Sequence, residues 1–84
     1  DHYILKHADG SHNIKALTPI DEFNEYFSSN FPTKDFDTIG GLVMHQFGYV
    51  PKRGEVVTLN TFNFSVIRAD KRRIRLMKLM RQDS

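Results

Sequence analysis

The serine and acidic side chains of this chain lack the spacing that hydrolytic chemistry requires. A covalent hydrolase needs a Ser, Thr or Cys nucleophile beside a base that a third group orients. The chain has no Cys, and no serine stands in a Gly-x-Ser-x-Gly elbow. Asp21, Glu22 and Glu25 gather at the start of an expected helix and not in a cleft. The sequence therefore predicts no catalytic residue, no bound cofactor and no enzymatic activity.

Two histidines, His7 and His12, are the candidates for binding a metal ion. They flank Asp9-Gly10, a pair that suits the two-residue loop of a type I′ hairpin. With that loop, three pairs of residues face each other across the strands: His7 and His12, Leu5 and Ile14, and Tyr3 and Ala16. A durable zinc site requires three or four ligands, and no other histidine is spaced to join these two. We favour a histidine pair that packs and titrates over a metal site.

Positive charge is concentrated in the last third of the chain. Residues 1–50 hold three Lys or Arg against seven Asp or Glu, whereas residues 51–84 hold nine against three. Six of these bases lie in the final stretch without an acid among them: Lys71, Arg72, Arg73, Arg75, Lys78 and Arg81. Such a stretch is either an anion-binding interaction surface or the solvated face of an edge strand. We favour the edge strand as the structural explanation.

The elements that position these residues follow from periodicity and turn signals. A hairpin over residues 3–16 is followed by a helix that Thr18 caps and that ends within Ser28-Ser29-Asn30. A second helix follows Asp37, with Gly48 as its left-handed end. Strands are expected over residues 56–59 and 62–68, and again over 72–81, where a helix is the alternative. The fold class is α+β, in the order β-β-α-α-β-β-β, with two helices on one face of an antiparallel sheet.

Gly40-Gly41 in the first turns of the second helix demands an explanation, because each glycine costs about 1 kcal/mol relative to Ala. Close approach of the helix to a sheet or to the other helix is the interpretation that we favour. The alternative is a helix N-terminus with free N–H groups that bind an anion.

Composition excludes several classes of protein. The chain is 39% hydrophobic and 26% charged, which is typical of one small globular domain. The absence of Cys favours a reducing compartment, and no apolar run approaches the roughly 20 residues of a membrane span. The basic stretch lacks the exposed aromatics of specific nucleic-acid readers, so only generic attraction to nucleic acid remains as an alternative.

Three motifs carry a resemblance to a known family. They are Thr38-Ile39-Gly40-Gly41, the Gly-x-x-Pro-x-x-Gly-Glu pattern from Gly48 to Glu55, and Asp70-Lys71-Arg72-Arg73-Ile74. Together they resemble the transporter-associated (CorC/HlyC) domain, without gaps over residues 37–74. Asn60 stands where that family is expected to have Gly, and a left-handed Asn would preserve the turn.

The resemblance implies much of the context. It implies a fold similar to a subdomain of FAD-binding (PCMH-type) oxidoreductases, with residues 1–84 as one accessory domain excised from the C-terminus of a larger protein. It also implies CBS and membrane domains of the same polypeptide as partners, self-association as a homo-oligomer as a further option, and a soluble location on the cytoplasmic side of the bacterial inner membrane. No established active site comes with it. An ion pair between Glu55 and Arg73 is a further expectation.

The leading hypothesis is a non-catalytic regulatory domain of a magnesium- and cobalt-efflux-like membrane protein. It would modulate transport through contacts made by the basic residues from Lys71 to Arg81. A small-ligand or divalent-metal sensor and a generic nucleic-acid binder are the alternatives.

Overall fold

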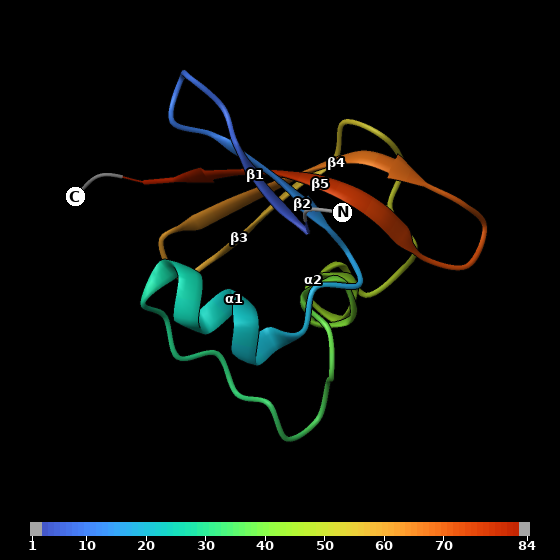
Figure 1. The fold of residues 1–84 in the computed structure, drawn as a ribbon. Helices are drawn as coiled ribbons and strands as arrows, with labels where there is room; N and C mark the ends of the chain where they lie inside the picture. The colour runs from blue at the N-terminus through green and yellow to red at the C-terminus, as the bar shows by residue number, and fades with distance from the viewer. Residues whose placement is uncertain (1–2, 83–84) are drawn as a thin grey trace.

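The computed structural model describes residues 3–82 and contains a five-stranded sheet with two helices. Its elements, in chain order, are β1 (Ile4–Lys6), β2 (His12–Lys15), α1 (Ile20–Phe27), α2 (Ile39–Phe47), β3 (Val56–Leu59), β4 (Phe62–Ala69) and β5 (Ile74–Arg81). All strand pairs are antiparallel, and the strand order is β1-β2-β5-β4-β3. Figure 1 shows both helices on the same side of the sheet. The predicted fold class and element order are confirmed.

The predicted register of the first hairpin was wrong by one residue. Ile4 pairs with Ile14 and Lys6 with His12, so His7 and His12 are not cross-strand partners. The His7 amide instead donates to the Ser11 carbonyl at 2.8 Å, which leaves a three-residue loop. The Asp9 carboxylate accepts hydrogen bonds from the amide and hydroxyl groups of Ser11, at 2.9 and 2.6 Å, and these contacts favour the longer loop.

The last strand is β5, and it is a central strand. The edge-strand interpretation of its basic residues was therefore wrong, whereas the preference for a strand over a helix is confirmed. Pairing with β2 on one side and β4 on the other uses the hydrogen-bonding groups of β5 on both of its edges. The charged side chains of β5 do not protect a sheet edge, because both edges of this strand are paired. Successive side chains of the strand project from opposite faces of the sheet.

The start of α1 differs from the prediction. Thr18 does not cap the helix, and its buried hydroxyl donates to the Lys15 carbonyl at 2.6 Å. Pro19 occupies the N-cap position, and its fixed φ with its missing N–H makes it compatible with a helix entry. The predicted end is correct, since Ser28 is left-handed with a φ of 53°.

Close packing against β2 explains the first glycine of α2. A Cβ on Gly40 would lie 2.4 Å from the Cβ of Ala16 and 2.7 Å from its carbonyl oxygen. The Gly40 amide donates to that carbonyl at 2.9 Å, the Ile39 amide donates to Thr18, and the Gly41 amide donates to the Thr38 hydroxyl. The packing interpretation is confirmed, and these N–H groups are not free for an anion.

Aromatic rings from both layers form the core between the sheet and α1. Phe23 is fully buried, and its ring centroid lies 4.6 to 5.9 Å from those of Phe27, Phe31, Phe62 and Phe64. Such pairs add about 0.5–1.5 kcal/mol each beyond the buried area. This cluster holds α1 against the sheet. It thereby determines which face of the sheet the helices cover and which face they leave exposed.

Candidate functional site

The six basic residues of the final stretch are divided between three places. Lys71, Arg72 and Arg73 lie on the β4–β5 turn, and Arg75 follows at the start of β5. Lys78 lies on the sheet face opposite the helices. Arg81 reaches the helix-covered face, where its Nη1 donates to the Phe27 carbonyl at 3.2 Å and its guanidinium lies 4.9 Å from the centroid of the Phe62 ring.

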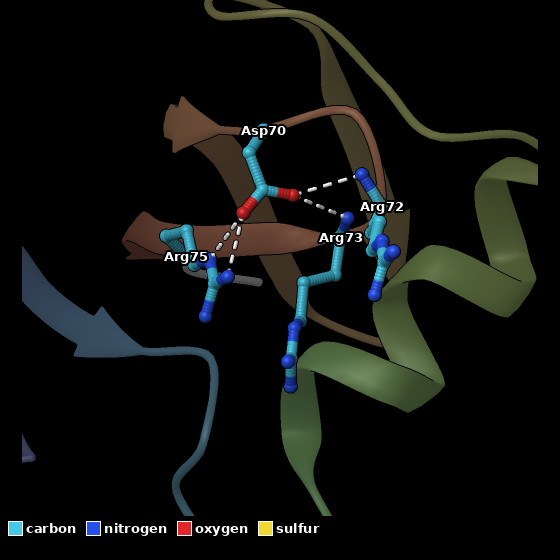
Figure 2. A network of polar contacts seen from close by, with 4 residues as sticks. All are labelled: Asp70, Arg72, Arg73 and Arg75. Atoms are coloured by element: carbon cyan, nitrogen blue, oxygen red, sulfur yellow. Dashed lines mark hydrogen bonds and ion pairs between the residues drawn. The ribbon is translucent and has the colours of Figure 1, made fainter.

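Asp70 organises the β4–β5 turn (Figure 2). Its Oδ1 accepts the backbone amides of Arg72 and Arg73 at 2.8 and 3.0 Å, and its Oδ2 accepts Nε and Nη2 of Arg75 at 2.7 and 2.6 Å. The two amide hydrogen bonds, followed by the bond from Arg75, lower the pKa of Asp70 to about 2. The carboxylate therefore stays ionised and holds the Arg75 guanidinium in a fixed direction.

A cavity of about 410 Å³ lies between this turn, the end of β2 and the start of α2. Its charged lining comes from Lys15, Arg68, Arg73 and Arg75, and no Asp or Glu among the described residues lines it. Figure 2 shows the Arg73 side chain extending from the turn toward the first turn of α2. The Lys15 ammonium lies over the Tyr3 ring, 5.8 Å from its centroid. Because this contact occupies the Lys15 ammonium, we attribute the positive charge available in the cavity to the three arginines.

The sheet face opposite the helices, which we call the open face, is a second candidate surface. Cross-strand partners share a face, and one row across the sheet runs Leu5, Asn13, Lys78, Ser65, Val56. The neighbouring row of Ile14, Met77 and Val66 is buried on the helix side, so the first row projects to the opposite side.

Several apolar side chains of the open face are exposed. Leu5 is 49%, Val56 57% and Met80 42% exposed, and no other element described in residues 3–82 covers this side of the sheet in Figure 1. Tyr3, Lys15 and Leu76 form another row of the same face. Lys15 and Lys78 give the open face a positive charge, and its described rows contain no acid.

His12 serves as a packing residue. Its ring contacts the rings of Phe27 and Tyr26 edge-on, with centroids 4.8 and 5.6 Å apart. Burial, with smaller contributions from Lys6 and His7, lowers the pKa of His12 below its usual value. Within residues 3–82, no group of three or more His, Cys, Asp or Glu side chains is placed to hold a metal ion.

The expected ion pair between Glu55 and Arg73 does not form. The Glu55 carboxylate accepts the hydroxyl of Tyr49 and, at 2.6 Å, the backbone amide of Lys52. These bonds lower the pKa of Glu55 and tie the loop before β3 together. Glu55 is thus a structural residue of that loop, and Arg73 remains available at the cavity.

Sequence reasoning missed three contributors to the cavity: Arg68, Ala16 and Leu17. Arg68 follows from no motif, and Ala16 and Leu17 reach the cavity from the other end of the chain. The only available signal was the packing requirement of Gly40, which predicted a close neighbour without identifying it. The role of Asp70 was also missed, although its place at a turn before consecutive amides is typical of an Asx turn.

Comparisons with known proteins identify the family of this chain. The family model of the transporter associated domain (CorC_HlyC) matches residues 5–83. The magnesium and cobalt efflux protein CorC of Pasteurella multocida is 49% identical over 61 residues, which are 73% of this chain and 20% of that protein. CorC of Buchnera aphidicola subsp. Schizaphis graminum is 52% identical over 62 residues, 74% of this chain and 21% of that protein.

A solved structure shows the same fold. The CorC-associated region from Neisseria meningitidis superposes with a TM-score of 0.91 at 35% identity, covering 95% of this chain and 99% of that one. The chain therefore belongs to the transporter associated domain (CorC_HlyC) family. It spans about a fifth of the length of the curated relatives that it matches. Among residues 3–82, no helix combines the length and apolar character needed to cross a membrane.

Proposed function

We propose that this chain is a non-catalytic accessory domain of a CorC-type ion-efflux protein, and that it acts by contacting another segment of the same polypeptide through its open face. The curated relatives are magnesium and cobalt efflux proteins, and about four fifths of each lies outside the segment matched here. An accessory domain of such a protein needs a surface that can bind the remainder.

The open face is the observation that carries the proposal. Exposed apolar patches on small domains mark interaction sites, because burial of each square ångström of apolar surface contributes about 25 cal/mol. Leu5, Val56 and Met80 are exposed apolar side chains of this face, and Lys78 stands in the middle of the polar residues that separate Leu5 from Val56 along their row. The complementary partner is an apolar segment that bears acidic residues.

Charge also favours this partner over a second copy of the chain. Two open faces would bring together two surfaces that each carry Lys15 and Lys78, and like charges in an interface are repulsive. An acidic segment removes that repulsion and leaves the apolar contact intact.

A pull-down experiment tests the proposal. The immobilised chain is incubated with the remainder of the Pasteurella multocida relative, produced without its matching segment. We expect retention of that remainder, and we expect Lys78→Glu and Leu5→Asp each to reduce it about tenfold, as hot-spot changes do. Glu25→Lys is the control. It reverses a charge at an exposed position of α1, away from the open face, and should leave retention unchanged.

Two outcomes would contradict the proposal: no retention by the parent chain, or equal losses from Lys78→Glu and Glu25→Lys. Thermal melts followed by circular dichroism verify that each variant is folded. A sedimentation experiment on the chain alone distinguishes binding to the remainder from self-association.

A further inference from the structure

We propose that the cavity beside Arg73 is a binding site for the phosphate group of a small organic phosphate or of a lipid headgroup. The cavity shares Lys15 with the open face, but Arg73, Arg75 and the α2 residues that line it lie outside the rows of that face. The proposal therefore does not depend on the contact with the remainder of the polypeptide. It goes beyond an accessory role, because it gives the domain a ligand of its own.

Uncompensated positive charge is the first observation. Arg68 and Arg73 line the cavity, and within residues 3–82 neither guanidinium makes an ion pair or a hydrogen bond. Arginine side chains that share a cavity repel one another, and a multivalent anion converts that repulsion into attraction. Guanidinium groups match the geometry of phosphate oxygens, which they can bind through two parallel hydrogen bonds.

Preorganisation is the second observation. Asp70 occupies Nε and Nη2 of Arg75, and the turn amides of Arg72 and Arg73 hold the Asp70 carboxylate in place. Arg75 is therefore oriented before any ligand arrives, which lowers the entropic cost of binding. The same two hydrogen bonds fix the backbone of Arg73, from which its side chain extends toward α2 (Figure 2).

The size and the remaining walls of the cavity indicate a ligand larger than an inorganic phosphate ion. A volume of about 410 Å³ falls within the range of small-molecule sites. Leu17, Met44 and Ile74 line it together with the arginines, so an apolar group attached to the phosphate would find an apolar wall. The amides at the start of α2 bond elsewhere, and recognition therefore rests on the side chains.

Titration with defined phosphates tests the site. Proton–nitrogen NMR spectra of the 84-residue chain, which report backbone amides and arginine Nε–H groups, are recorded with inorganic phosphate, pyrophosphate and phenyl phosphate. We expect saturable shifts at Leu17, Thr38, Gly41 and the Arg75 side chain. Phenyl phosphate should bind about fivefold more tightly than inorganic phosphate, because its ring contacts the apolar wall.

Adjacent arginines provide a matched pair of variants. Arg73→Gln removes a cation that lines the cavity, and we expect about tenfold weaker binding of pyrophosphate, the effect of losing one charge-assisted hydrogen bond. Arg72→Gln removes the same charge one residue away, outside the lining, and should change the affinity less than about twofold. Lys78→Glu on the open face is a second control.

Vesicles distinguish the two sources of the phosphate. The chain is sedimented with phosphatidylcholine vesicles that contain or lack phosphatidylglycerol. Binding of phenyl phosphate without vesicle binding indicates a free organic phosphate, whereas vesicle binding that Arg73→Gln abolishes and Arg72→Gln preserves indicates a headgroup. The proposal is overturned by an absence of binding in both arms, or by equal losses from the two arginine variants.

Discussion

Asp70 uses its two carboxylate oxygens for different purposes. Oδ1 closes the β4–β5 turn through the amides of Arg72 and Arg73, and Oδ2 orients the Arg75 guanidinium. A single side chain thereby determines both the backbone of the turn and the direction of one arginine at the cavity. This arrangement requires the ionised carboxylate, because a protonated acid loses the charge that makes these bonds strong.

A pH dependence follows from the lowered pKa of Asp70. Since the folded-state pKa is about 2 and the ordinary value is 3.8, the unfolded chain binds more protons in that interval. The stabilisation from Asp70 is therefore complete above about pH 4 and is lost as the pH falls toward 2. Thermal melts between pH 5 and 2 should show a smaller acid-induced decrease of the melting temperature for Asp70→Asn than for the parent chain.

The matched control for this prediction is Asp35→Asn, which removes the same charge at an exposed loop position. NMR titration of the Asp70 carboxyl carbon gives a direct measurement. A midpoint near 4 would contradict the prediction, because it would mean that the turn amides and Arg75 do not favour the ionised form.

At the scale of the elements, the contact between α2 and β2 sets the shape of the cavity. Gly40 lies against Ala16, and its amide donates to the Ala16 carbonyl. This close approach brings the start of α2 next to the end of β2 and leaves Arg73 and Arg75 to complete the lining. Glycine is a poor helix former, but it is required at position 40 because any Cβ there would clash with Ala16.

We expect Gly40→Ala to destabilise the fold by about 2 kcal/mol. The overpacking penalty of roughly 1–3 kcal/mol or more exceeds the gain of about 1 kcal/mol in helix propensity, because the clashing atoms of Ala16 include its backbone. Gly41→Ala is the control, since its nearest contact is the Thr38 hydroxyl at 3.3 Å, and its net effect should stay within about 1 kcal/mol. Urea denaturation measures both, and equal values for the two variants would refute the packing explanation.

At the scale of the whole molecule, one aromatic cluster decides which face of the sheet is covered. Phe23 projects from α1 into rings from β4 and from the segment after the helix, and both helices lie on that side (Figure 1). The opposite face keeps its apolar side chains exposed. The same packing choice therefore creates both the core and the surface that we propose as the contact with the remaining polypeptide.

Phe23→Ala should remove a large share of the stability of the domain. Truncation of a buried Phe costs about 3–5 kcal/mol, and domains of this size have only about 5–15 kcal/mol in total. Tyr26→Ala is the control, because Tyr26 lies on the same helix and is 51% exposed, so its loss should cost about 1 kcal/mol or less. Chemical denaturation followed by circular dichroism compares the two, and a fully cooperative Phe23→Ala transition near that of the parent chain would argue against this role of the cluster.

The sequence by itself determined the elements and the family. Periodicity and turn residues are local signals, so the two helices, the later strands, the left-handed Gly48 and Asn60 and the strand character of β5 could all be predicted. The family motifs lie close together in the chain and identified the domain. The glycine at position 40 also predicted close packing, because a propensity loss requires a compensating contact.

Tertiary structure alone decided the register, the sheet order and the surfaces. Pattern alone could not place β5 in the centre of the sheet, because the same alternation occurs in edge and central strands. The hairpin register depended on whether Asp9 bonds Ser11, a side-chain choice that shifts every facing pair by one residue. The cavity combines residues from β2, α2, β4 and β5, and the open face combines rows from five strands. Such surfaces arise only when distant segments pack, since no local signal in the chain records which of them will meet.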